Sequence, residues 1–199
     1  MAITNGYASL NEVKAALKII DGLDDSLLEM AIESASRLID GYTGRYFYNA
    51  GTATKNFAAE DMWITQIDDA QSVSEVATTN QVGDDYTVWT ANDYQLEPLN
   101  GTVDGLVSPA TRIRAVNQYV FPFYNGQALV KVTGVWGWAS VPIAVKQATI
   151  LQASRIFKRL DSPLGVAGFG DMGVVRVGSR LDPDVQHLVD PYRSMKNFA

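Results

Sequence analysis

Residues 141–160 read VPIAVKQATILQASRIFKRL, the longest stretch of the chain with a helical pattern and no internal glycine or proline. Pro142 lies near its start, where the missing N–H of proline costs nothing because the first turn of a helix leaves that group unpaired. Apolar residues cover a wider arc than a surface helix needs. We therefore expect a central helix that packs on more than one side and ends at Asp161-Ser162-Pro163.

The most regular helical pattern lies earlier, in a segment that begins at Asp24 or Asp25 and ends at Gly41 or Gly44. Its apolar residues recur at the three- and four-residue spacing of a helix. We expect the core to join this segment to the central helix through Leu28, Ile32, Leu38 and Ile39 on one side and Ala148, Leu151 and Ile156 on the other.

Two shorter helices are marked by their N-terminal caps. Ser9 and Glu12 have the spacing of a capping box, which predicts a helix from about Leu10 to Lys18. Asp182-Pro183 combines an N-cap with proline at the first helical position and predicts a last short helix. We expect that helix to turn Val185, Leu188 and Val189 inward.

The chain between Arg45 and Trp138 is rich in Thr, Val, Tyr, Trp, Asn, Asp and Gly and has no helical periodicity. We expect short strands there, separated by turn signals such as Asn100-Gly101 and Asn125-Gly126. The expected strands are 52–58, 62–67, 72–78, 86–89, 94–98, 112–115 and 128–136. The predicted fold class is α+β: a small helical bundle formed by residues 1–44 and 139–199, with a β-rich insertion at residues 45–138.

The composition narrows the range of functions. The chain has 199 residues, 47% of them hydrophobic, and no apolar run reaches the roughly 18 residues that span a bilayer. The start of the sequence has no pattern of a secretory signal. The absence of cysteine excludes disulfides and thiolate sites. A net charge of −6 makes the chain a poor candidate for wrapping nucleic acid, but it is compatible with lining a passage through which DNA slides.

We find no catalytic set, metal site or cofactor site. His187 is the only histidine, and we place it on the solvent face of the last helix. The glycine-rich segment GVAGFGDMG at 165–173 contains G-x-x-G-x-G, but it follows a helix, whereas the dinucleotide fingerprint follows a strand. A connector segment is the better interpretation of these glycines.

Eight residues around this segment are candidates for contact with a partner protein or a neighbouring subunit. The basic residues at the end of the central helix can dock on an acidic surface, or can simply form a solvated helix end. The run at 174–177 can add as a strand to a neighbour's sheet, or can fold back on the β-rich region of its own chain. The eight candidates are Arg155, Lys158, Arg159, Phe169, Val174, Val175, Arg176 and Val177.

Several passages in order resemble the head–tail connector (adaptor or head-completion) proteins of tailed bacteriophages. The strand that ends in Gly137-Trp138 is followed by Val141-Pro142 and by a helix that begins Lys146-Gln147-Ala148. The second helix ends in Tyr-Thr-Gly-Arg at 42–45, and the short last helix closes with Leu188 and Pro-Tyr-Arg at 191–193. These passages cover about half of the chain, near its two ends.

The resemblance implies a structural virion protein that is not an enzyme and needs no cofactor. Such proteins form a ring, commonly of twelve copies, below the portal protein, where the ring continues the DNA channel without sequence-specific binding. The implied partners are further copies of the chain, the portal protein and the next head-completion or tail protein, with no membrane. The implied location is the head–tail interface of the virion, and before assembly the protein is expected in the host cytoplasm. The alternatives are another phage ring protein, such as a tail-completion protein or stopper, and a small enzyme with a glycine-rich active-site loop.

Overall fold

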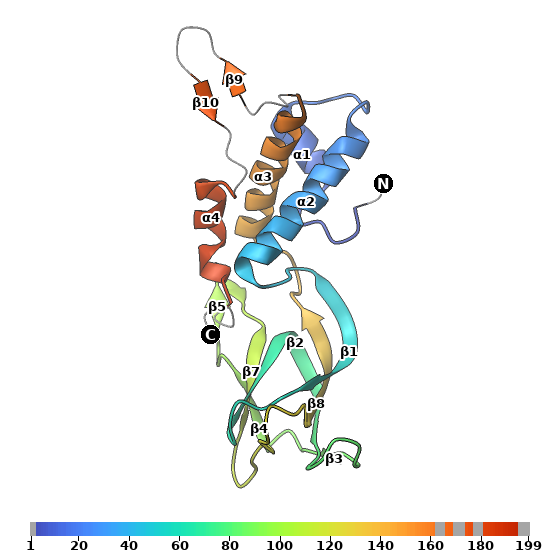
Figure 1. Cartoon of the computed structure of the whole chain (residues 1–199), viewed down its shortest axis with the longest axis vertical. Coiled ribbons are helices and arrows are strands. Elements are labelled where there is room, and N and C mark those ends of the chain that lie inside the picture. The colour runs from blue at the N-terminus through green and yellow to red at the C-terminus, as the bar shows by residue number, and fades with distance from the viewer. Residues whose placement is uncertain (1–2, 162–165, 169–173, 177–180, 195–199) are drawn as a thin grey trace. The chain divides into compact units, whose positions relative to one another are not determined.

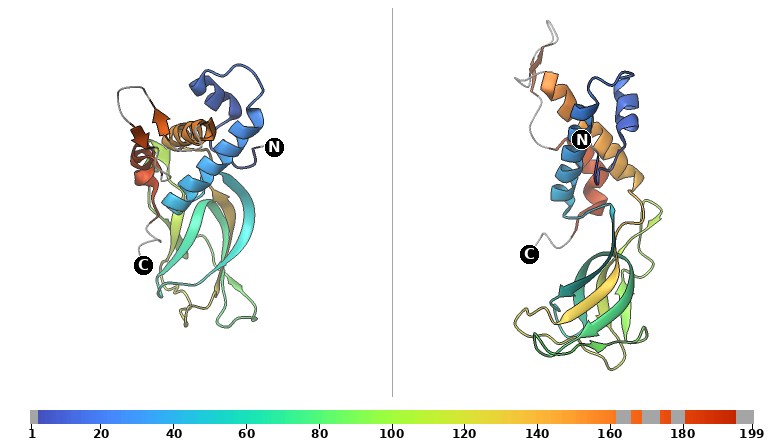
Figure 2. Two further views of the ribbon diagram at one scale, coloured as in Figure 1. Left: turned by 45° about the horizontal axis from the view of Figure 1, so that its top comes forward. Right: turned by 90° about the vertical axis from the view of Figure 1, so that its right-hand side faces the viewer.

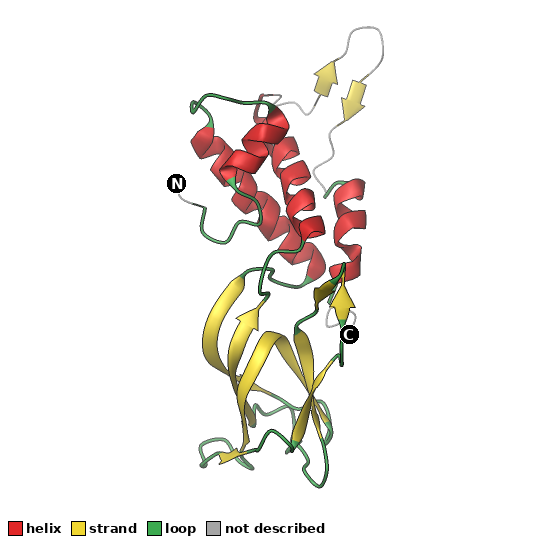
Figure 3. Cartoon of the chain, turned by 180° about the vertical axis from the view of Figure 1, so that it is seen from behind, coloured by secondary structure: helices red, strands yellow, loops and turns green. Residues whose placement is uncertain are grey.

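The computed structural model describes residues 3–161, 166–168, 174–176 and 181–194. The chain forms two compact units, Met1–Phe47 with Val141–Ala199 and Tyr48–Ser140, which we call the helical unit and the β unit. Figure 3 shows helices in the first and strands of a larger sheet in the second. The α+β class with a β-rich middle is confirmed. The domain limits placed at residues 44 and 139 stay a prediction.

The helical unit contains α1 (Leu10–Leu17), α2 (Asp25–Thr43), α3 (Ile143–Asp161) and α4 (Pro183–Val189), and a 3-10 turn at Asp190–Tyr192 (Figure 1). The expected capping box at the start of α1 is present. α2 ends at Gly44, which has a φ of 68° and donates its N–H to the carbonyl of Asp40. The Asp182 side chain caps α4 by accepting the N–H of Asp184.

The core of the helical unit lies where α1, α2 and α3 meet. Its buried members are Ala8, Val13, Leu28, Ala31, Ile32, Ala35, Ala153 and Phe157, with Ile150 and Ile156 packed against them. The prediction that Leu38 and Leu151 belong to the core is wrong, because Leu38 is 44% exposed and Leu151 is 47% exposed. Both helices carry apolar residues on more than one face, so apolar spacing alone could not distinguish the inner face from an outer apolar stripe.

The β unit is built on an antiparallel sheet with the strand order β1-β8-β2-β7-β4, and β3 pairs with β2 (Figure 2). Its strands are β1 (Asn49–Phe57), β2 (Ile64–Thr78), β3 (Thr87–Val88), β4 (Tyr94–Glu97), β7 (Ala110–Ala115) and β8 (Val130–Gly137). β5 (Thr102–Val103) and β6 (Leu106–Val107) form a separate small hairpin that the sequence did not predict. Asp104 and Gly105 join them with positive φ values, as a tight hairpin requires.

One prediction in this unit is wrong in a simple way. The expected strands 62–67 and 72–78 form the single strand β2. Its pairing with β8 shifts register between Ala70 and Ser72, and its pairing with β7 shifts between Gln66 and Ala70. These irregularities interrupt the alternation of inward and outward side chains along β2. The sequence of one bulged strand therefore resembled that of two separate strands.

The core of the β unit is aromatic. Trp89 stacks on Phe121 with ring centroids 4.7 Å apart, and Trp136 packs against Phe57. β8 passes so close to β2 at Gly134 that a side chain there would meet the backbone carbonyl of Ser72. This explains the glycine in a buried strand.

Candidate functional site

The predicted contact residues at the end of α3 are in part engaged within the chain. The guanidinium of Arg155 forms an ion pair with the carboxylate of Asp182, the N-cap of α4. This pair links the end of α3 to the start of α4. Lys158 and Arg159 are exposed, so the basic end of α3 retains two charges at its surface.

The second group of predicted contact residues has a partner inside its own chain. Val174, Val175 and Arg176 form β10, which pairs antiparallel with β9 (Val166–Gly168). Within the described residues, β10 joins only this two-stranded sheet and not the sheet of the β unit. Phe169 and Val177 lie outside the described residues. Contact of this hairpin with a neighbouring subunit or with the portal stays a prediction.

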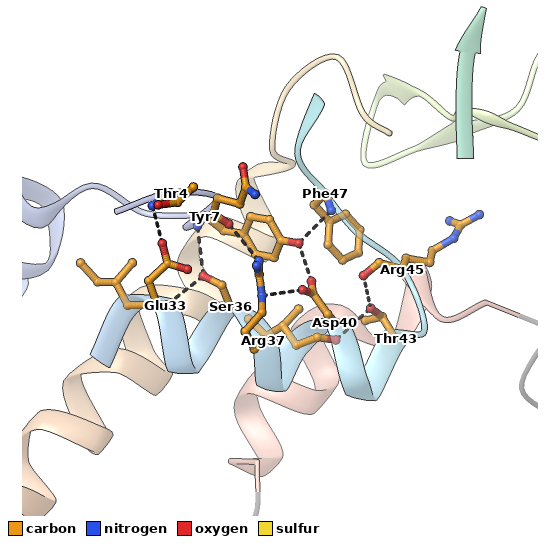
Figure 4. A network of polar contacts seen from close by, with 12 residues as sticks. Thr4, Tyr7, Glu33, Ser36, Arg37, Asp40, Thr43, Arg45 and Phe47 are labelled. Carbon is orange, nitrogen blue, oxygen red and sulfur yellow. Dashed lines mark hydrogen bonds and ion pairs between the residues drawn. The ribbon is translucent and has the colours of Figure 1, made fainter. Parts of the chain in front are cut away.

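A buried polar network that the sequence did not reveal lies in the helical unit (Figure 4). The Tyr7 hydroxyl donates a hydrogen bond to Asp40 Oδ1 and accepts one of 2.9 Å from the backbone N–H of Phe47. The backbone N–H of Tyr7 donates to Ser36 Oγ at 3.1 Å. Arg37 Nε lies 2.8 Å from Asp40 Oδ2, an ion pair without hydrogen-bond geometry. The network fastens the segment before α1 to the last turns of α2.

The titration of this network fits a structural role. Burial raises the pKa of Tyr7 far above its ordinary value, and the hydrogen bond to Asp40 adds to the rise. Burial also raises the pKa of Asp40, against the opposing effects of the Tyr7 hydroxyl and of Arg37. A phenol whose proton is held this firmly serves as a fixed hydrogen-bond donor at neutral pH.

A second polar contact joins α1 to α3. Lys146 Nζ lies 3.0 Å from Glu12 Oε1, the side chain that also completes the capping box at Ser9. The backbone N–H of Ser9, with help from Lys146, lowers the pKa of Glu12 from its ordinary 4.5 to about 2. One carboxylate thus caps a helix and ties it to α3.

Apolar surface is exposed along the outer faces of the two long helices. We name the α2 stripe by the uncharged exposed residues Leu23, Leu27, Met30, Ser34, Leu38 and Gly41. We name the α3 stripe by the exposed residues Ile143, Gln147 and Leu151. The sequence analysis assigned Leu38 and Leu151 to the core, so it did not recognise either stripe.

A third apolar surface lies in the β unit. The backbone N–H groups of Phe121 and Ala115 donate to the carbonyls of Met62 and Trp63, both at 2.8 Å, and hold two segments side by side. This arrangement brings together exposed large side chains that we call the β patch: Met62, Trp63, Tyr119, Val120, Phe123 and Tyr124. Exposed patches of this kind mark protein interaction sites.

The described residues hold little that supports chemistry at a metal. No group of three His, Asp or Glu side chains among them comes together in a way that could bind a metal ion. His187 is exposed on α4, as predicted. None of the helices in the described ranges combines the length and apolarity that crossing a bilayer requires.

Comparison with known proteins identifies one family. The model of the family described as "Phage gp6-like head-tail connector protein" matches residues 7–84, which hold α1, α2, β1 and β2. No curated protein matches the sequence.

Solved structures share the fold of the whole chain. Matching chains come from structures titled "Neck of empty GTA particle computed with C6 symmetry" and "Neck of native GTA particle computed with C12 symmetry". Both are 18% identical, and the matches cover 98% of this chain and 93% of those chains, with TM-scores of 0.59 and 0.56. The family match and the shared fold together confirm that this chain resembles the head–tail connector proteins of tailed bacteriophages.

Proposed function

We propose that this chain is a structural neck protein of a tailed-phage particle, and that twelve copies form a ring below the portal that joins the head to the tail. The observation that carries the proposal is the match of residues 7–84 to the head–tail connector family. The shared fold with chains from particle necks, over 98% of this sequence, supports it.

The surfaces of the chain support a role in assembly. A protein that works alone rarely exposes many large apolar residues in groups, whereas a ring subunit must contact its neighbours and the proteins above and below it. The α2 stripe, the α3 stripe and the β patch offer separate surfaces for such contacts. The partners in this proposal are further copies of the chain, the portal protein and the next head-completion or tail protein.

The charge of the chain supports a channel that DNA passes through. With a net charge of −6, the chain repels phosphates on average and would not hold the genome in place. We expect the isolated protein to bind duplex DNA weakly, without the steep salt dependence of a protein that neutralises many phosphates. Tight, salt-sensitive duplex binding would contradict the channel role.

Particles made without the protein test the proposed role. A nonsense mutation in the gene should yield DNA-filled heads and free tails, and supplying the wild-type protein should restore joined particles in electron micrographs. Antibody labelling of complete particles should mark the neck just below the head, which distinguishes a connector from a tail-completion protein. Joined, infectious particles that lack the protein would contradict the proposal.

A further inference from the structure

The α2 stripe and the α3 stripe lie on one helical unit, yet neither covers the other. Leu28, Ile32 and Ile39 of α2 are fully buried, and the first two belong to the core that α2 shares with α3. At about 100° per residue, the α2 stripe is centred roughly 130° around the helix from these residues. By the same reasoning, the α3 stripe is roughly 130° from the buried face at Ala148 and Val145. Each stripe therefore points away from the α2–α3 contact.

Large exposed side chains make these stripes more than ordinary surface. Leu23, just before α2, is 88% exposed, Met30 on α2 is 53% exposed, and Ile143 on α3 is 73% exposed. Arg37 borders the α2 stripe two turns beyond Met30, and its guanidinium is paired with Asp40. Both stripes are exposed in the structure, and no described residue of the chain covers them.

Gly41 adds an independent observation on the α2 stripe. Glycine within a helix lowers the stability of that helix relative to alanine. A Cβ atom at Gly41 would meet no atom within 4 Å. Packing inside the chain therefore gives no reason for glycine there, whereas close approach of a second helix does. Ser34, about two helical turns before Gly41, is also small.

Charge indicates what kind of surface fits each stripe. Asp21 and Asp24 lie at the N-terminal end of the α2 stripe, and Lys158 and Arg159 lie at the C-terminal end of the α3 stripe. The α2 stripe runs about 21 Å from Leu27 to Gly41 and the α3 stripe about 12 Å from Ile143 to Leu151, so the shorter stripe can lie along part of the longer one. An antiparallel pairing of the two stripes places apolar residues on apolar residues and the acidic end against the basic end.

Symmetry allows the same pairing between copies. α2 and α3 run in opposite directions within one chain (Figure 1). Rotation about a ring axis that lies along these helices keeps that relation between α2 of one copy and α3 of the next. A ring with head-to-tail contacts needs two different, complementary surfaces on each subunit, and these stripes provide them.

We propose that the α2 stripe of one copy packs against the α3 stripe of the next copy, and that this contact forms the ring. The proposal rests on the ring of the proposed function and assigns its subunit interface. The β patch lies outside this contact and remains for another partner.

A mixing experiment tests this interface. Met30→Glu blocks the α2 stripe and Leu151→Glu blocks the α3 stripe, and both sites are exposed, so the fold should persist. Native mass spectrometry should show rings for the wild-type chain and monomers for each variant alone. An equimolar mixture of the two variants should give dimers and nothing larger, because each pair retains a single intact contact. We expect at least a tenfold rise in the concentration needed for half-assembly of each variant.

Val82→Glu is the matched control, since Val82 is 72% exposed in the β unit and should assemble like wild type. Circular dichroism checks the fold, and Leu27→Gln and Ile143→Gln replace any variant that fails to fold. Rings from both blocked variants would overturn the assigned interface while leaving the neck role intact. A wild-type chain that forms no ring alone is assayed in particles, where Met30→Glu and Leu151→Glu should fail to restore joining and Val82→Glu should succeed. Absence of the wild-type chain from particles would instead overturn the proposed function.

Discussion

The Tyr7 hydroxyl donates its hydrogen bond to a buried oxygen of Asp40, a residue 33 positions further along the chain. Tyr7 is 2% exposed, and the same hydroxyl accepts the N–H of Phe47. One side chain thus joins the segment before α1, the last turns of α2 and the backbone that follows α2. Its aromatic ring also packs edge-on against Phe47 with centroids 5.6 Å apart.

Tyr7→Phe should therefore lower the free energy of unfolding by about 1–3 kcal/mol, because it leaves a buried carboxylate oxygen and a backbone N–H without their partner. Urea denaturation of the purified chain measures the change. Tyr42→Phe is the control, since that hydroxyl donates to Asp190 at an exposed site and should matter much less. Equal effects of the two substitutions would show that the Tyr7 network carries no special stability.

The corrected core gives a second comparison. Leu28→Ala should cost on the order of 2–5 kcal/mol, because Leu28 is fully buried between α2 and its neighbours. Leu151→Ala removes the same atoms from a side chain that is 47% exposed, and should cost less than about 1 kcal/mol. Denaturation of both variants under one set of conditions checks the difference. A larger loss from Leu151→Ala would restore the original assignment of the inner face of α3.

Glu12 should make stability depend on pH in the acid range. Its pKa is lowered in the folded chain from 4.5 to about 2, so the folded state binds this proton less tightly than the unfolded state does. The contribution is fully present above pH 4.5 and is lost as the pH falls through about 2. Glu12→Gln should abolish this acid-dependent loss of stability, because glutamine does not titrate. Glutamine also preserves the capping box.

The raised pKa of Asp40 acts in the opposite sense, because the folded chain binds that proton more tightly. Asp40 is present in both wild type and Glu12→Gln. Its contribution therefore cancels when the unfolding free energies of the two proteins are subtracted at each pH. Thermal unfolding at steps from pH 5 to pH 2 should show the wild type losing its advantage. A constant difference across that range would contradict the assigned role of Glu12.

Two glycines of the β unit separate backbone strain from steric contact. Gly51 and Gly137 have φ values of 77° and 87°, but only at Gly137 would a Cβ atom collide, with the carbonyl oxygen of Tyr48. Gly51→Ala should cost about 1–2 kcal/mol for the left-handed conformation alone. Gly137→Ala should cost about 2–5 kcal/mol, because the neighbouring backbone must also move. Similar losses in the two variants would mean that the close approach is easily relieved.

Hydrogen exchange can test whether β10 contacts a neighbouring subunit or the portal. Pairing with β9 uses one edge of β10, so alternate amides in 174–176 should be protected in the free chain. If the other edge receives a strand on assembly, the remaining amides should become protected in complete particles or rings. Unchanged exchange of the 174–176 amides on assembly would exclude strand addition at this edge. The amides of α4 serve as an internal reference.

Local signals in the sequence predicted most of the elements. The capping box at Ser9, the glycine C-cap at Gly44 and Asp182-Pro183 each depend on a few neighbouring residues, so they survive without knowledge of the tertiary fold. The fold class followed from the change in composition after Arg45. Each of these features depends on residues that are close together in the sequence.

The parts that failed depend on residues distant in sequence. Whether Leu151 faces the core or the solvent is decided by where α2 and α4 pack on α3, and the wide apolar arc of α3 is compatible with either. The pairing of Tyr7 with Asp40 joins residues on separate segments, and neither residue has a motif around it. The three exposed apolar surfaces escaped prediction for the same reason, because an apolar residue in a sequence is expected to be inside.

The helical unit is assembled from both ends of the chain, and this imposes an order on its synthesis. The ribosome completes α2 at Thr43 and does not begin α3 until Ile143. At a synthesis rate of about 5–20 residues per second, roughly 5–20 seconds pass between the completion of α2 and the start of α3, and the inner face of α2 has no α3 to pack against during this time. The β unit is contiguous and can fold in that interval. A truncated chain that stops before α3 therefore lacks both the core of its first helices and the second of the two stripes, and under the proposed interface it could cap a growing ring but never close one.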